Sequence, residues 1–263
     1  LASEVREAEE RVRTAMRNAG FHLSARKITV NLSPANVRKE GTACDLPVAI
    51  AVLAAYGIVM PSGLKQTGFL GELGLDGKIK PVRGVLSMVL AMAEKGLERC
   101  FLPEENVAEG MAADCMEIVK IRKLQEVVEL LNEPDRICFE RASDLSGVQT
   151  AYGVDFCEVN GQKLMRRATE VAVAGGHNLL YIGPPGSGKS MMARRIPTIM
   201  PELSREEQLE VSKVYSICGM LPEGHALVGT RPYRAPHHTI SAQALTGGGI
   251  WPKPGEISLA SRG

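Results

Sequence analysis

The chain has 263 residues and a net charge of +1, from 31 basic and 30 acidic side chains. This length allows two domains with buried cores. The near balance of charge excludes a partner held by uniform surface charge, but it is compatible with a local basic patch. The six cysteines are scattered and none forms C-x-x-C, so we expect free, buried thiols rather than a zinc or redox site.

No segment has the pattern of a membrane span. The longest apolar run, residues 46–60, is too short to cross a bilayer and contains both Pro47 and Gly57. The start carries no signal-peptide pattern. We therefore expect a cytoplasmic protein without a membrane partner. Because the chain begins at Leu1 and ends at Gly263, we also expect a fragment cut at both ends.

The first predicted elements are a helix and a strand. Apolar residues at helical spacing predict a helix over 3–19, ended by Gly20. Ile28, Val30 and Leu32 then alternate with polar residues, which predicts a half-buried strand.

A helix and a hairpin are predicted next. Asp45 is expected to cap a helix over 46–56. Residues 68–75 and 78–82 are expected to form two strands joined at Asp76-Gly77, a turn signal typical of hairpins. The remaining expected elements are a helix over 85–95 closed by Gly96, strands over 99–102 and 115–121, and a helix over 124–132.

These patterns predict an α+β domain over 1–132. Periodicity is lost over 133–152, which indicates a linker. A second, α/β domain is predicted over 153–263. It opens with a helix that ends near Ala174, and the expected apolar face of this helix is Leu164, Ala168, Val171 and Ala172.

A phosphate-binding loop follows that helix. Residues 178–182 are apolar and short, as expected for a buried strand, and residues 191–196 are expected to form a helix. Between them stands G-x-x-x-x-G-K-[ST], a motif that needs this strand and helix around it. Its residues are Gly183, Pro184, Pro185, Gly186, Ser187, Gly188, Lys189 and Ser190.

Each residue type of the loop has a chemical reason. Glycines let backbone N–H groups form a concave anion site at the start of a helix. Lys189 would reach the β- and γ-phosphates, and the Ser190 hydroxyl would bind Mg²⁺. The alternative is a Gly/Pro turn followed by a surface lysine. The motif therefore predicts ATP and Mg²⁺ as ligands.

The first domain resembles the proteolytic domain of Lon proteases, a ribosomal S5 domain 2-like fold, through residues 39–44, 71–85 and 102–106. Lon enzymes use a serine activated by a lysine. The positions that match these two residues hold Ala43 and Leu86, and neither side chain can act as nucleophile or base. The resemblance thus implies a Lon-like fold without peptidase activity, used for assembly or partner binding.

The second domain resembles the magnesium-chelatase-like AAA+ ATPases of the ComM/YifB family, with a ChlI-type ATPase domain. The similar pieces are residues 159–162, 174–180 leading into the loop, 231–241 and 247–260. The resemblance implies a ring-forming ATPase, usually a hexamer, acting as a DNA motor for branch migration in transformation. It also implies that the Walker B acids, the polar sensor and the arginine finger are missing from this chain, so the catalytic residues stay unknown.

Residues 231–241 form a candidate DNA or pore loop. Arginines offer charge, an aromatic ring offers stacking and histidines offer hydrogen bonds. The candidates are Arg231, Tyr233, Arg234, His237 and His238. The alternative is a structural insert whose histidines satisfy buried carbonyls, and Arg194-Arg195 are expected on a solvated helix face.

Three functions are therefore carried forward. The first is a ring ATPase motor with DNA as partner. The second is a chelatase-type metal-insertion ATPase subunit, which the Lon-like domain disfavours because the chelatase ATPase subunits lack it. The third is a non-catalytic assembly module.

Overall fold

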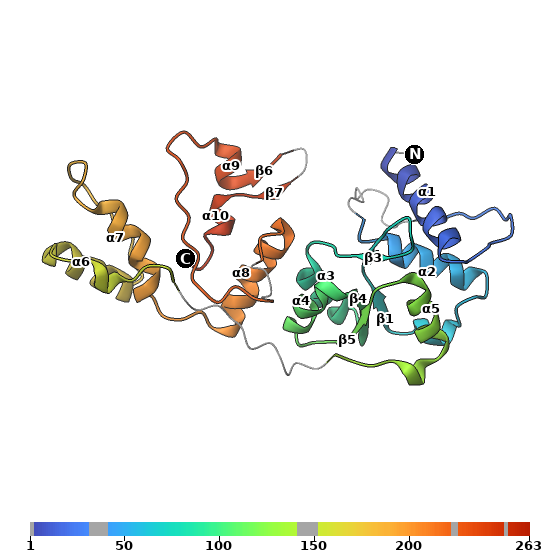
Figure 1. Cartoon of the computed structure of the whole chain (residues 1–263). Helices are drawn as coiled ribbons and strands as arrows, with labels where there is room; N and C mark the ends of the chain where they lie inside the picture. Colours follow the sequence, from blue (N-terminus) through green and yellow to red (C-terminus); the bar gives the residue numbers. More distant parts are fainter. Residues whose placement is uncertain (1–2, 32–41, 141–151, 222–225, 250–251) are drawn as a thin grey trace. The chain divides into compact units, whose positions relative to one another are not determined.

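The structure is a computed structural model. It describes residues 3–31, 42–140, 152–221, 226–249 and 252–263. The chain divides into two compact units, Leu1–Ser146 and Gly147–Gly263 (Figure 1). The division falls in the stretch where the sequence predicts a linker, of which residues 141–151 lie outside the described residues.

The first unit is built on a parallel sheet. Within the described residues its strands are β1 (Thr67–Phe69), β4 (Arg99–Pro103) and β5 (Glu117–Ile121), in the order β1-β4-β5. Phe69 pairs with Phe101 in register, and their rings stack with centroids 5.2 Å apart. The central strand β4 is fully buried over 100–102. An apolar strand of this kind is expected in a parallel sheet that is covered on both faces.

Helices pack against this sheet and against one another (Figure 1). They are α1 (Ser3–Asn18), α2 (Asp45–Ala55), α3 (Val85–Glu94), α4 (Val107–Ala112) and α5 (Leu124–Asn132), with short 3-10 turns at Pro61–Leu64, Glu104–Asn106 and Pro134–Arg136. The four predicted helices are confirmed to within one residue at each end. The short helix α4 was not predicted, because its six residues are too few to show a period. Unit 1 is thus a mixed α/β unit with a parallel sheet.

The predicted hairpin is confirmed, but its first strand is split. Strands β2 (Glu72–Leu73) and β3 (Ile79–Lys80) pair antiparallel, and the Gly74 N–H donates to the Lys78 carbonyl at 2.8 Å. Residues 67–69 belong instead to the parallel sheet. The break falls at Gly71, whose φ is +157° and where a Cβ would lie 2.5 Å from the Ile79 side chain. Only glycine fits there, and the strand direction changes at this residue.

Asp45 is not the helix cap that the sequence predicts. It is the first residue of α2, and Cys44 holds the cap position. The Asp45 carboxylate is buried and accepts two hydrogen bonds from Arg11 of α1, at 2.7 and 3.1 Å. A charged two-point pair with Arg11 outcompetes a single backbone N–H. The residue therefore ties α1 to α2 rather than ending a turn.

The strand predicted around Ile28 and Val30 is also wrong. Residues 22–31 contain no strand, and these two side chains are 47% and 52% exposed. No described strand lies alongside to accept their backbone hydrogen bonds, and alternation alone does not make a strand. Leu32, the third residue of the pattern, lies outside the described residues.

The second unit consists of helices and loops with one short hairpin. Its helices are α6 (Lys163–Ala174), α7 (Lys189–Arg195), α8 (Arg205–Cys218), α9 (Ala242–Thr246) and α10 (Glu256–Leu259); 3-10 turns lie at Phe156–Glu158 and Ile196–Ile199, and strands β6 (Gly247–Gly248) and β7 (Lys253–Pro254) pair. The helices expected before and after the phosphate loop are confirmed as α6 and α7.

Two predictions about burial in this unit are wrong. Residues 178–182 form no strand, and Leu180 and Ile182 are 80% and 88% exposed. The expected apolar face of α6 is open as well, with Leu164 at 85% and Val171 at 52% exposed; only Ala172 is buried. A strand exists only against a partner strand, and no described segment pairs with 178–182.

Candidate functional site

The loop of residues 183–190 connects the segment after α6 to α7. Gly186 and Gly188 have φ values of +79° and +86°, in the left-handed region that favours glycine. A Cβ at either position would meet no described atom within 4 Å. The requirement for glycine therefore comes from backbone conformation rather than from crowding. Gly188 directly precedes α7, so the loop turns straight into the helix.

The Lys189 side chain folds back over this loop. Its ammonium donates to the carbonyl oxygens of Gly183 and Pro184 at 2.9 and 2.7 Å, and to the Ser187 hydroxyl at 3.1 Å. All three acceptors are neutral, and among the described residues no carboxylate pairs with it. The loop thus holds a full positive charge without a counter-ion.

The same loop carries backbone donors that have no partner among the described residues. The N–H groups of Gly186, Gly188, Lys189 and Ser190 donate to no residue that the structure describes. Lys189 and Ser190 open α7, where the first N–H groups have no partner within the helix. The Ser190 side chain is exposed. Unpaired donors beside an uncompensated ammonium fit a phosphate group, and the adjacent hydroxyl fits its bound Mg²⁺.

Two contacts fix the loop to the rest of the unit. The Gln162 side-chain amide donates to the Ser187 carbonyl at 3.4 Å. At the other end of α7, Arg195 donates to the Glu158 carboxylate at 2.5 and 3.1 Å and to the Asp155 carbonyl at 3.0 Å. The expectation of a solvated face is therefore wrong for Arg195. No sequence signal marks a pair 37 residues apart.

A small apolar core lies beneath α7. Met192 is fully buried and packs with Phe156 and Val159. These two residues belong to the turn and loop that precede α6, so α7 packs against the segment that carries Gln162. This packing holds the start of α7, and with it the loop, in place.

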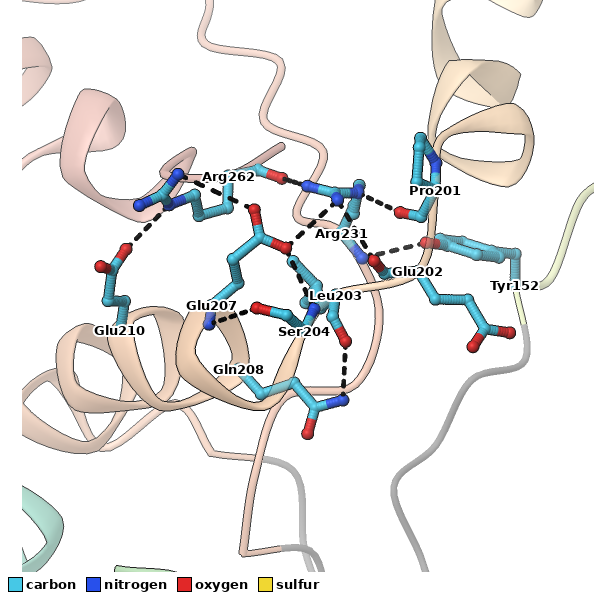
Figure 2. Close-up of polar contacts among 10 residues, drawn as sticks. All are labelled: Tyr152, Pro201, Glu202, Leu203, Ser204, Glu207, Gln208, Glu210, Arg231 and Arg262. Carbon is cyan, nitrogen blue, oxygen red and sulfur yellow. Dashed lines mark hydrogen bonds and ion pairs between the residues drawn. The ribbon is translucent and has the colours of Figure 1, made fainter.

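Arg231 of the candidate DNA loop lies inside a polar network (Figure 2). Its guanidinium donates to the Pro201 carbonyl, to the Arg262 carbonyl at 2.7 Å and to the Glu207 carboxylate at 3.3 Å. Its backbone N–H donates to the Tyr152 hydroxyl at 2.9 Å. Only 10% of this side chain is exposed. Arg231 thus joins α8 to the end of the chain.

The other candidates of this loop differ in how they are held. Arg234 pairs with Glu256 through two bonds of 2.6 Å, and this pair raises the pKa of Arg234 and lowers that of Glu256. The rings of His237 and His238 lie 4.1 Å apart, and both are exposed. Tyr233 is 40% exposed. Because both arginines are occupied within the chain, the geometry favours the structural alternative for them.

The position that matches the Lon active site lies in unit 1. Leu86 is fully buried, and its N–H donates to the Glu109 carboxylate at 2.8 Å. The Ala43 carbonyl accepts from the Gly71 N–H. Next to it, the Thr42 hydroxyl bonds to a carboxylate oxygen of Glu72. Residues 39–41 of the resembling stretch lie outside the described residues.

The remaining features to report are metal ligands, membrane spans and cysteines. Within the described ranges no cluster of three or more His, Cys, Asp or Glu side chains is placed to hold a metal ion. No described helix is both long enough and apolar enough to span a bilayer. The expectation of buried thiols holds for Cys100 alone, and its burial raises the pKa to about 12. The exposed cysteines are Cys44, Cys115, Cys138 and Cys157.

Comparison with known proteins identifies the family. The family model of the magnesium chelatase subunit ChlI matches residues 155–263, and a second model, also described as subunit ChlI of Mg-chelatase, matches residues 1–106. The competence protein ComM of Haemophilus influenzae is 41% identical over 98% of this chain and 51% of its own length. The uncharacterised protein YifB of Escherichia coli is 39% identical over 98% of this chain and 50% of its own length.

A more distant likeness covers less of the chain. Lon protease 2 of Bacillus subtilis is 28% identical over 48% of this chain and 23% of its own length. The chain spans about half the length of ComM and YifB. Two matching family models and identity along nearly the whole chain lead to one conclusion: the chain belongs to the magnesium-chelatase-like family of ComM and YifB.

Proposed function

We propose that residues 183–190 bind ATP with Mg²⁺. We further propose that residues 153–263, in unit 2, form the first part of a P-loop AAA+ ATPase domain. The observation that carries this proposal is the Lys189 ammonium, whose partners among the described residues are the neutral oxygens of Gly183, Pro184 and Ser187. A phosphate that enters the loop exchanges these weak acceptors for charged ones.

The residues of the loop then have distinct roles. Lys189 binds the β- and γ-phosphates, and the amides of Gly186, Gly188, Lys189 and Ser190 hold the β-phosphate oxygens. Ser190 binds Mg²⁺ through its hydroxyl. Hydrolysis further needs a carboxylate that holds Mg²⁺, a group that orients water, and an arginine from a neighbouring subunit. We assign these to the half of ComM and YifB that this chain does not span.

Nucleotide binding by the 263-residue chain tests the loop. Lys189→Ala is compared with Lys253→Ala, which removes an exposed lysine in β7 of the same unit. Binding of a fluorescent ATP analogue should weaken at least about tenfold in the first variant, because charge-assisted hydrogen bonds are lost, and stay unchanged in the second. Equal affinity of Lys189→Ala and the parent would refute the assignment.

For the whole protein we propose a ring-forming, hexameric ATPase motor that acts on DNA. ComM is a competence protein, and the identity to it extends over 98% of this chain, which supports this choice over metal insertion. The test is ATPase stimulation in the complete protein. Branched DNA should increase turnover and a porphyrin should not. Stimulation by porphyrin alone would favour the chelatase alternative, and partner binding without any ATP dependence would favour the assembly module.

For unit 1 we propose a Lon-like domain, over 1–132, that has no peptidase activity and serves assembly. The support is the methyl group of Ala43 and the buried aliphatic chain of Leu86 at the two positions that need a nucleophile and a base. Thr42, the residue before Ala43, has a hydroxyl, and it is bonded to a carboxylate instead of a lysine. Casein cleavage that disappears in Thr42→Ala would contradict this proposal.

A further inference from the structure

Unit 2 contains a groove that lies apart from the loop of residues 183–190. Its volume is about 770 Å³, within the range of small-ligand sites. It is bounded by the last turn of α7, by the segment 233–240 and by the start of α10. In Figure 1 this segment runs up to α9 without helix or strand. The side chains that matter are those of Arg194, Tyr233, Arg234, Pro236, His237 and Glu256.

Among the residues that the structure describes, one cation of the groove has no carboxylate partner. Arg234 and Glu256 neutralise each other through their two bonds of 2.6 Å. Arg194 is exposed, and in the part of the chain that the structure describes no carboxylate pairs with it. Its neighbour Arg195 differs, since it is tied to Glu158. The walls therefore carry a net charge of about +1, supplied by Arg194.

A hydrogen-bond donor lies on the same wall. His237 Nδ1 accepts from the Thr239 backbone N–H at 3.4 Å and lies 2.8 Å from the Thr239 hydroxyl. When Nδ1 accepts from the Thr239 N–H, the N–H of the ring is on Nε2. His237 is exposed, so this N–H can donate to an anion. Arg194 and His237 together thus offer a cation and a hydrogen-bond donor.

The remaining wall suits a flat ring. Tyr233 is 40% exposed, and Pro236, which is also exposed, lines the same groove. An aromatic side chain can stack on any nucleic-acid base, because every base has a flat π-face. The groove therefore combines a stacking surface with a single site for negative charge.

We propose that this groove binds a single-stranded nucleic acid, with one base stacked on Tyr233 and the adjacent phosphodiester held by Arg194 and His237. The inference rests on the proposed action on DNA and names where the strand is held. Charge decides between strand and free nucleotide, because a phosphodiester carries one negative charge, which Arg194 matches, whereas a free di- or triphosphate carries several. In a duplex the base is already stacked and cannot reach Tyr233.

The charged contact proposed here differs from the one that the sequence predicts within residues 231–241. Arg231 and Arg234 hold the fold, and the available charge comes from Arg194 of α7, which the sequence predicts only as a solvated residue. Lys189 opens the same helix five residues earlier, and no residue of 183–190 lines the groove.

Binding of fluorescein-labelled dT20 to the complete protein, without nucleotide, tests the inference. Tyr233→Ala should weaken binding about 5- to 150-fold through loss of one stacked base, whereas Tyr233→Phe should bind like the parent. Arg194→Ala should lower the slope of log affinity against log salt by about 0.7, the value for one phosphate contact on a single strand. Arg167→Ala, which removes an exposed arginine of α6, is the matched control and should change neither.

The outcomes separate this inference from the proposed nucleotide site. Lys189→Ala should lose the ATP analogue and keep dT20, so a failure of the loop assignment leaves the groove testable. Parent-like dT20 binding by both Tyr233→Ala and Arg194→Ala overturns the proposal, as does an equal loss in Arg167→Ala. Displacement of dT20 by thymidine monophosphate as effective as by unlabelled dT20 would also overturn it, because the groove would then be a mononucleotide site.

Discussion

Arg231→Ala distinguishes a structural arginine from one that binds DNA. The side chain donates to the carbonyls of Pro201, Glu202 and Arg262 and to the Glu207 carboxylate, and it is 90% shielded from solvent (Figure 2). In the variant each of the three carbonyls loses a hydrogen-bond donor, which lowers stability by about 1 kcal/mol each. Glu207 loses less, because it keeps the Ser204 N–H at 3.0 Å and the Arg262 guanidinium at 3.7 Å. The expected loss in the free energy of unfolding is about 2–4 kcal/mol.

This loss should be confined to unit 2. With a urea slope of about 2 kcal/mol/M, the unfolding midpoint of the unit falls by about 1–2 M. Hydrogen exchange of the α8 amides is the suitable measurement, because it follows the helix that carries Glu207 independently of unit 1. Arg167→Ala, with its exposed pair to Glu170, should leave exchange unchanged.

Two results would refute this account of Arg231. One is an Arg231→Ala protein with parent-like exchange in α8. The other is full recovery of stability in Arg231→Lys, since an ammonium cannot reproduce the fork that reaches several carbonyls at once. If Arg231→Ala were stable and yet lost affinity for DNA, the arginine would belong to the nucleic-acid contact after all.

Three further predictions concern single residues. Gly110→Ala should destabilise unit 1 by about 1–3 kcal/mol in urea unfolding, although alanine favours helices, because its Cβ would lie 2.2 Å from Leu102; a stabilised variant would contradict this. The Cys100 thiol, whose burial raises its pKa to about 12, should resist a thiol reagent at pH 8 until urea is added, and native labelling as fast as at exposed Cys138 would contradict it. Arg234 lowers the pKa of Glu256 below its usual value of 4.5, so the pair stabilises unit 2 above that value and the benefit is lost as pH falls through the lowered pKa; Glu256→Gln should reduce the melting temperature at pH 6–7 and converge with the parent in acid, and a difference that persisted at pH 2 would refute the assignment.

Local signals predicted unit 1 well where a pattern was complete within one segment. The helix α5 carries its apolar face on Leu124, Val127, Val128 and Leu131, all of which are buried. The hairpin turn was marked by Asp76-Gly77, and Gly77 has the left-handed φ of +79° that such a turn requires. In both cases the sequence determines the element through neighbours only a few residues away.

Pairs distant in sequence were not predictable. Asp45 has every local feature of a helix cap, and it binds Arg11 across 34 residues instead. Arg194 and Arg195 stand side by side in the sequence, yet one is tied to Glu158 and the other is left in the groove. The choice between them depends on which face of α7 meets the turn at 156–158, and a single sequence contains no signal for it.

The loop of residues 183–190 forms as predicted, whereas the strand expected just before it does not. The loop forms because its constraints are local: Gly186 and Gly188 supply positive φ, and the Lys189 ammonium bonds to oxygens two to six residues away. The strand at 178–182 has the right composition, but its hydrogen bonds need a partner that no described segment provides. The loop is thus formed on a support held by Gln162 and by α7, without a sheet behind it. Since affinity depends on how far a site is ordered before binding, this chain should bind nucleotide more weakly than a protein in which the strand is paired.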